Sequence, residues 1–437
     1  MNRPSTLFDT APPGAAAIEP HSAMLDRSAA AHLAGDEIEA RQALGAYLLL
    51  RVIDRIVGLQ RVDTPEDRDG LRFQLASVTR FIEDLPKVEH VEANHLAGLA
   101  KVLGVFDKDG ERRLRIGLLA YSWHLEQAGH LEEALDVLGL SEPFYRESGP
   151  DELTNLGMTA GRFHRTLAHW DQADSAYQLG YESAEVRHDR RGMLLARLGR
   201  AKVVLGRGNL PESRRQIEAI IAEADGKDLA EARAWGYADL AVVLERQDLP
   251  WDGLRANYFA FQHLRDSQDR ARVLSSLGVS LRAVGAFGAA KTALESVLRS
   301  TTNSYLTSNA KVELMGLGAD LNDEVMFVRF WRAAGEHASA MAPSLGVDYR
   351  FQAAHGLAKF DRRNSAARWF KDARELAERN NLNEWYFRIV QAEAMQPIET
   401  ALEVDRSVPS LATGHEPTVD EIEKGLRHYA EALVGEP

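Results

Sequence analysis

Two short stretches of this sequence contain residue types that bind metal ions. Residues 90–95, HVEANH, hold His90, Glu92 and His95. Two ligands on one face of a helix need a spacing of three or four residues, which the two histidines do not have. Residues 107–111, DKDGE, begin like a calcium-binding loop, but the remaining ligands of that loop are missing. We therefore expect a turn between helices at 107–111 and no metal site in either stretch.

The sequence also lacks a phosphate-binding loop and the common motifs of a catalytic nucleophile. Residues 204–211, VLGRGNLP, contain Gly206 and Gly208, but Pro211 stands at the third glycine position. The chain has no cysteine, which excludes disulfides, thiolate zinc sites, iron–sulfur clusters and a cysteine nucleophile. No G-x-S-x-G turn is present. We therefore predict a protein that is not an enzyme and needs no cofactor.

The overall charge and hydropathy limit the classes of partner. The 437 residues carry a formal net charge of −13, whereas binding to nucleic acid depends on clustered Lys and Arg. The most apolar run, residues 43–59, includes Arg51, Asp54 and Arg55 and is shorter than the ~20 apolar residues that cross a bilayer. We expect a cytoplasmic protein without a membrane or direct nucleic-acid partner, in which 43–59 form an amphipathic buried helix.

Apolar residues recur at helical spacing through nearly all of residues 24–396, and strand-like alternation is absent. The breaks between these segments are short, so the sequence predicts an all-α protein. Gly278, Gly285 and Gly288 fall within one such stretch, although glycine inside a helix costs about 1 kcal/mol relative to alanine. We expect a close approach of two helices at Gly278 and a left-handed turn at Gly285.

An internal repeat explains these glycines. Pairs of small residues recur twelve positions apart, and successive pairs are 37–40 residues apart, or 76 where a degenerate unit at 309–334 intervenes. A large residue usually follows three positions after the first small residue and four positions after the second. The pairs are Ser122/Ala134, Gly161/Ala173, Ala201/Ser213, Ala241/Gly253, Gly278/Ala290 and Ala354/Ala366.

This pattern resembles the tetratricopeptide repeat (TPR), most closely in residues 159–180 and 276–297. The resemblance covers roughly residues 112–392 and implies a right-handed superhelical α-solenoid of TPR-like helical hairpins. The units are longer than the ~34 residues of the common repeat. They are similar in this respect to the units of bacterial TPR regulators that bind short peptides.

The resemblance suggests five segments. We expect an N-terminal segment without order, a helical N-terminal module or cap, an array of about seven units, a linker, and a C-terminal helix that covers the hydrophobic end of the solenoid. Thr418 and Glu421 form a predicted capping box at the start of this last helix. The predicted bounds are 1–23, 24–110, 111–396, 397–417 and 418–437.

In TPR proteins one stripe of the first helix of each unit lines the concave groove. Here the matching positions are unusually basic for an acidic chain, which suggests a groove that binds an acidic segment or a C-terminal carboxylate. The competing interpretation is a solvated helix face without a ligand. The candidate binding residues are Asn155, Arg162, Arg165, Lys202, Trp235, Arg272, Arg282, Phe351 and His355.

Two functions fit this sequence. The first is a non-catalytic scaffold that binds a protein or peptide in the concave groove. The second is a bacterial sensory regulator whose array binds a short peptide and changes the N-terminal helical module. A homo-oligomer is compatible with both functions.

Overall fold

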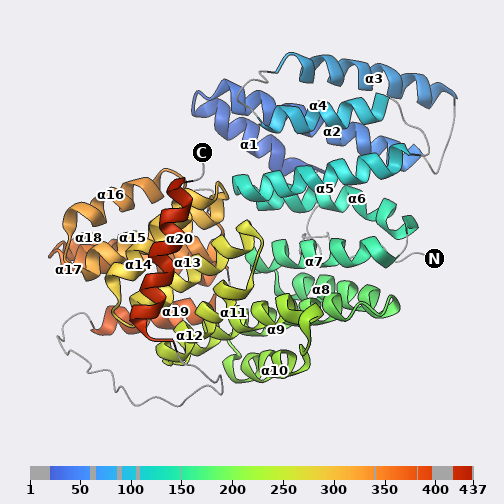
Figure 1. The fold of residues 1–437 in the computed structure, drawn as a ribbon. Helices are drawn as coiled ribbons and strands as arrows, with labels where there is room; N and C mark the ends of the chain where they lie inside the picture. Colours follow the sequence, from blue (N-terminus) through green and yellow to red (C-terminus); the bar gives the residue numbers. More distant parts are fainter. Residues whose placement is uncertain are drawn as a thin grey trace.

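The computed structural model describes residues 20–59, 65–85, 91–104, 109–148, 150–338, 341–380, 382–395 and 417–435, and its regular elements are all helices (Figure 1). Most of the segments 1–23 and 397–417 lies outside these residues. The helix α1 already begins at Ser22, within the first of those segments. The bounds are α1 Ser22–Leu33, α2 Glu37–Leu59, α3 Pro65–Glu83, α4 Val91–Gly104, α5 Gly110–Ala128, α6 Leu131–Ser148, α7 Pro150–Thr166, α8 Trp170–Val186, α9 Arg190–Gly206, α10 Leu210–Glu223, α11 Ala230–Arg246, α12 Pro250–His263, α13 Ser267–Ala283, α14 Phe287–Ser300, α15 Ser304–Asp320, α16 Glu324–Gly335, α17 Pro343–Lys359, α18 Arg363–Arg379, α19 Asn383–Met395 and α20 Val419–Gly435.

Seven consecutive helical hairpins run from α5/α6 to α17/α18, which confirms the predicted all-α solenoid. The first helices of the second to seventh hairpins, from α7 to α17, each have 17 residues. Each hairpin turn contains one residue with a left-handed backbone, a conformation that Gly, Asn and Asp adopt at the lowest cost. These residues recur every 37–40 positions and are Gly129, Ala168, Gly208, Asp248, Gly285, Asn322 and Asp361.

The hairpin turns share one hydrogen-bond pattern at the end of the first helix. In the fifth hairpin the amide of Ala286, just after Gly285, donates to the carbonyl of Leu281 at 2.9 Å. The equivalent bond joins Leu249 to Leu244, also at 2.9 Å. This six-to-one bond is the Schellman motif, which satisfies a carbonyl that the helix leaves free. Leu281 and Leu244, each three residues after the first small residue of its pair, therefore accept the hydrogen bond that ends the first helix.

The paired small residues are where the two helices of a hairpin touch. A Cβ atom on Gly278 would lie 2.7 Å from the Cγ atom of Leu294, the large residue four positions after Ala290. Such a contact is too short for carbon atoms, so only glycine allows these helices to approach. Nothing lies within 4 Å of a Cβ atom built on Gly288, so packing does not explain that glycine. The predicted roles of Gly278 and Gly285 are confirmed.

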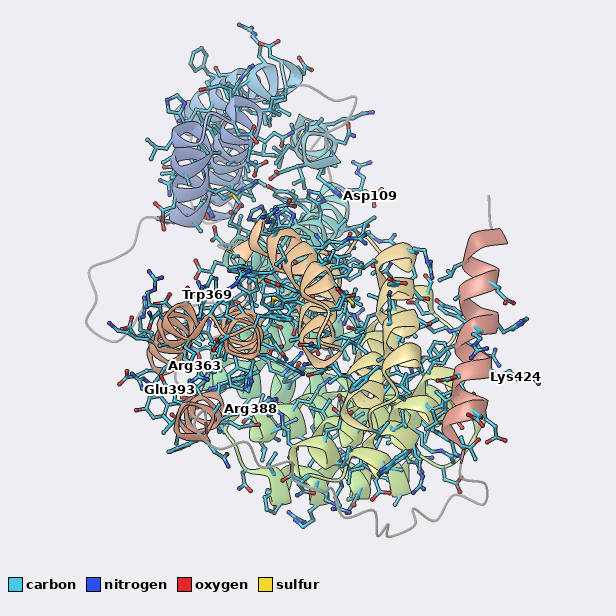
Figure 2. The ribbon with its side chains drawn as sticks, turned by 90° about the vertical axis from the view of Figure 1, so that its left-hand side faces the viewer. Asp109, Arg363, Trp369, Arg388, Glu393 and Lys424 are labelled. Atoms are coloured by element: carbon cyan, nitrogen blue, oxygen red, sulfur yellow. The ribbon has the colours of Figure 1, made fainter. Side chains whose placement is uncertain are left out.

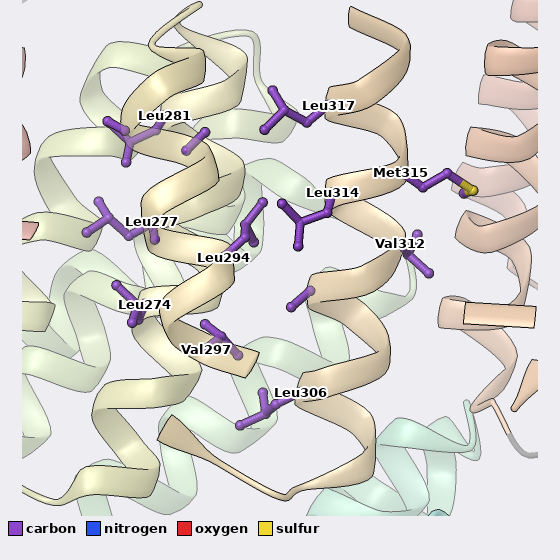
Figure 3. Close-up of a cluster of buried hydrophobic side chains, with 14 of the residues drawn as sticks. Leu274, Leu277, Leu281, Leu294, Val297, Leu306, Val312, Leu314, Met315 and Leu317 are labelled. Atoms are coloured by element: carbon purple, nitrogen blue, oxygen red, sulfur yellow. The ribbon is translucent and has the colours of Figure 1, made fainter. Parts of the chain in front are cut away.

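The core is continuous across hairpins. Leu277 and Leu281 on α13, Leu294 on α14, and Leu314 and Leu317 on α15 belong to one buried cluster (Figure 3). Burying apolar surface supplies most of the stability of such a stack, at roughly 25 cal/mol per Å². A second cluster joins α1–α4 to the first hairpins, from Met24 to Phe163. The N-terminal helices therefore share a core with the array.

The array curves until its two ends meet. Helix α15 of the sixth hairpin contacts α5 of the first. Ala342, which precedes α17, belongs to the same apolar cluster as the N-terminal helices. Ala168, between α7 and α8, and Trp170, the first residue of α8, pack against the cluster of α17 to α19. These contacts close the concave side into a ring.

The C-terminal helix α20 does not cover the end of the solenoid, contrary to the prediction. Its buried residues Ile422 and Leu426 join the cluster of α12 to α15, and the helix packs on α14. Figure 2 shows Lys424 of α20 on the opposite side of the molecule from Trp369 of α18 and Arg388 of α19. The predicted capping box is confirmed, because the amide of Thr418 donates to Glu421 at 2.8 Å.

Candidate functional site

A cavity of about 400 Å³ lies inside the ring. Its walls include residues from the first helices of all seven hairpins and from α19, so both ends of the array contribute. Its volume lies within the usual range for small-ligand pockets, about 300–1,000 Å³. The residues used below are Glu126, Arg162, Arg165, Trp170, Lys202, Trp235, Asp239, Arg246, Arg272, Tyr305, Glu384 and Trp385.

The cavity wall has more basic than acidic side chains, although the whole chain is acidic. Five cations and three carboxylates line it. Three of these cations have carboxylate partners. Arg162 pairs with Glu126 at 3.0 Å, Lys202 pairs with Asp239 at 3.3 Å, and Arg246 pairs with Glu384 at 2.6 Å.

Arg165 and Arg272 are the two cations without a carboxylate partner. Among the described residues, no carboxylate lies within ion-pair distance of either guanidinium. The Nε atom of Arg165 is buried and has no hydrogen-bond partner. Two guanidinium groups that line a cavity without carboxylate partners favour an added anion, which a guanidinium binds through charge-assisted hydrogen bonds.

The electrostatics of the neighbouring groups support this assignment. Burial lowers the pKa of Arg162; Glu126 opposes that effect, and the positive charges of Arg272 and Arg165 add to it. These three guanidinium groups are therefore close enough to repel one another. Burial also raises the pKa of Asp239, against the attraction of Lys202 and Arg165. An anion bound among the arginines would relieve their mutual repulsion.

Tyr305 of α15 faces the same arginines. Its side chain lines the cavity. Burial raises the pKa of its phenol, and the nearby charges of Arg165 and Arg272 act in the opposite direction. The neutral phenol adds a hydrogen-bond donor and acceptor beside the arginines.

Five of the nine predicted residues line the cavity: Arg162, Arg165, Lys202, Trp235 and Arg272. The structure brings together residues from α7, α9, α11 and α13, as the repeat pattern requires. The predicted stripe thus coincides with the cavity wall across four consecutive hairpins.

Arg282 is not among the cavity residues, although it occupies the predicted stripe. Its guanidinium donates to Asp320 at 2.6 Å, to Glu313 at 2.9 Å and to Gln352 at 3.1 Å. These bonds join α13 to α15 and α17, and the side chain is only 16% exposed. Its three donor atoms all bond to side chains of neighbouring helices, so the structure gives Arg282 a packing role.

The other three predicted residues also lie away from the cavity. Phe351 is buried among aromatic rings, with its centroid 5.7 Å from that of Trp385. His355 is exposed on α17, and its ring lies 4.8 Å from that of Phe351. Asn155 is exposed near the start of α7. Phe351 and His355 of the seventh hairpin thus contact other aromatic rings, whereas Ser344 and Leu345, nearer the start of α17, line the cavity.

Several cavity residues were missing from the sequence prediction. Tyr305 belongs to the sixth hairpin, where no small-residue pair marked the stripe. Glu126 lies four residues after Ser122, the same offset that selected Arg165 after Gly161. Extending the rule to the first unit would therefore have found it. Arg246 and Glu384 carry no such signal, because their pairing joins residues 138 positions apart.

The stretches considered for metal chemistry have other roles. Glu92 is bonded to Arg27 and to Tyr121, and the ring of His95 stacks on that of His124. His90 and residues 105–108 lie outside the described residues. Within the part of the chain that the structure describes, no group of His, Cys, Asp and Glu has a geometry suited to a metal ion. No described helix is long and apolar enough to cross a membrane.

Comparison with known proteins identifies a fold and no family. No family model and no curated protein matches the chain. A solved structure of a Rap protein complexed with Competence and Sporulation Factor is similar, with a TM-score of 0.50 and 10% identity over 78% of this chain and 99% of that one. The chain has the fold of that protein. The apo form of the quorum sensor NprR from B. thuringiensis gives a TM-score of 0.45 and 12% identity, covering 81% of this chain and 98% of that one.

Proposed function

We propose that this chain is a non-catalytic binding protein that holds an acidic peptide or protein segment in its central cavity. The observation that carries the proposal is the pair of arginines, Arg165 and Arg272, that face the cavity without carboxylate partners. Charge-assisted bonds from a guanidinium to a carboxylate are among the stronger hydrogen bonds in proteins. The Rap protein of the same fold was solved in complex with Competence and Sporulation Factor, so this fold can hold a partner.

A second function, sensory regulation, has one specific observation in its favour. The cavity wall includes α5 and α15, the helices whose contact closes the ring, and α5 also packs on α4 of the N-terminal module. A ligand that bound the closed ring more tightly than an opened ring would shift the population between them. Small-angle scattering distinguishes the two functions, because only the regulator should change its radius of gyration when ligand binds.

Titration with charged peptide pools tests the proposed binding. We would measure binding of acidic, neutral and basic heptapeptide pools by isothermal titration calorimetry. The acidic pool, whose carboxylates include a free C-terminus, should bind about tenfold more tightly than the neutral pool, whose C-terminus is amidated, since one charged hydrogen bond is worth that much. Arg165→Gln should remove the difference. Arg215→Gln, which changes an exposed arginine on α10 that pairs within its own helix, should leave it intact.

The opposite result would contradict the proposal. If the basic pool bound as tightly as the acidic pool, or if Arg165→Gln kept the acidic preference, the two arginines would have no part in binding. The stripe would then be a solvated helix face.

A further inference from the structure

The closed ring limits how a chain can enter the cavity. An extended segment that ran along the whole concave side would have to pass the contact between α5 and α15. It would also meet the packing of Trp170 against the cluster of α17 to α19, and the Arg246–Glu384 pair that joins α11 to α19. A peptide that inserts only one of its ends reaches the cavity without passing these contacts. This geometry favours an end over an internal segment.

The charge of the cavity distinguishes the two ends of a peptide. The α-amino group at an N-terminus is protonated at neutral pH, so the surplus of cations on the cavity wall repels it. The C-terminal carboxylate is an anion whose two oxygens match the planar donors of a guanidinium. Arg165 and Arg272 line the cavity without carboxylate partners and supply these donors.

The remaining wall suits the side chain of a terminal residue. Trp170, Trp235 and Trp385 line the cavity together with apolar residues such as Leu205 and Val242. Aromatic walls bury much apolar surface and provide rigid contacts. The site therefore combines one anion position with an aromatic pocket.

We infer that the cavity recognises the free C-terminal carboxylate of a peptide with a large apolar residue at or near its end. This inference rests on the proposed peptide-binding function and specifies which part of the peptide is bound. Arg165 and Arg272 hold the carboxylate, and the three tryptophans contact the side chain.

Two peptide pools that differ in one chemical group test this inference. Both are heptapeptides of the same sequence composition with Leu or Phe at the last position; one pool ends in a free acid and the other in an amide. A third pool is amidated and carries Asp at its centre. Binding to the full chain is followed by intrinsic tryptophan fluorescence and by the unfolding temperature.

The free-acid pool should bind about tenfold more tightly than either amidated pool. Arg272→Gln and, separately, Arg165→Gln should reduce binding of the free-acid pool to the level of the amidated pools. Arg272→Lys, which keeps the charge but loses the planar donors, should recover part of the affinity. Arg215→Gln is the matched control and should bind like the wild-type chain. If one variant fails to fold, the difference in affinity between the free-acid and amidated pools for the wild-type chain still tests the inference.

Two outcomes would overturn the inference, and they can be told apart. If the amidated pool with central Asp bound as tightly as the free-acid pool, recognition of the chain end would be wrong while peptide binding stood. If no pool bound at all, the proposed function would fail, and this inference would fail with it.

Discussion

Two arginine clusters in this molecule have opposite charge balances. Around Arg27 of α1, one guanidinium is surrounded by three carboxylates: it binds Glu92 at 2.7 Å and Glu133 at 2.9 Å, and it also binds Glu39. In the central cavity, five cations share three carboxylates. The guanidinium of the first cluster has carboxyl partners within the fold, whereas two guanidinium groups of the second have none. We interpret the first as structural and the second as a binding site.

The pKa values of Glu92 and Glu133 determine the net charge of the first cluster. Burial would raise the pKa of Glu92, but its bonds from Arg27 and from the Tyr121 hydroxyl hold it below the usual range. For Glu133, burial prevails over Arg27 and raises the pKa to about 8. One carboxyl group is therefore protonated at neutral pH, which brings the cluster closer to neutrality without a ligand.

Arg27→Met is the strongest test of this comparison. It removes a guanidinium bound to three carboxyl groups, two of which are buried, and leaves them without that cation. Breaking a buried ion pair on one side typically costs about 3–5 kcal/mol. We expect a loss of that size in the free energy of unfolding, measured by urea denaturation. A loss below about 1 kcal/mol, the usual value of a surface pair, would contradict the structural role.

His21 gives the stability of the N-terminal region a pH dependence. Its ring bonds Asp136 at 2.7 Å and Asp54 at 3.0 Å, linking the start of α1 to α6 and α2. Burial lowers its pKa, but these two carboxylates prevail and raise it from 6.5 to about 9. The stabilisation is therefore fully present below pH 6.5 and is lost as the pH rises through about 9.

His21→Asn should remove this dependence. Wild-type protein should exceed the variant by up to about 3 kcal/mol in the free energy of unfolding near pH 6, since each pKa unit corresponds to 1.36 kcal/mol. The two curves should converge near pH 10. Chemical denaturation from pH 6 to 10 checks this, and parallel curves over the whole range would show that His21 is not charged in the folded protein.

The sequence predicted the fold because the repeat is a local pattern of packing. Gly278 and Leu294 are in direct contact because they belong to one hairpin, and the same contact recurs between Gly161 and Tyr177. The turns were harder to recognise. Their left-handed positions are occupied by four residue types, including Ala168, so they carry no single sequence signature.

The site was predicted only in part, because pairing depends on helices far apart in the sequence. Arg272 and Arg282 lie on one helix, and the same rule selected both. Only the tertiary structure places Glu313 and Asp320 beside Arg282 and leaves Arg272 without a carboxylate partner. A repeat pattern predicts which face of a helix is concave. It does not predict which of its charges are already neutralised.

The smallest expected effect is on the stability of the ligand-free protein, in the pair Arg272→Gln and Arg282→Gln. Arg272 has no carboxylate partner and adds to the positive charge around Arg162, so its loss should change the free energy of unfolding by no more than about 0.5 kcal/mol. Arg282→Gln leaves the buried Glu313 carboxylate without this partner and should cost several times as much. Both substitutions remove the same charge from α13, so urea denaturation of the two variants isolates the effect of pairing. If Arg272→Gln were as destabilising as Arg282→Gln, Arg272 would be part of the folded framework, and the cavity would lose one of its two free cations.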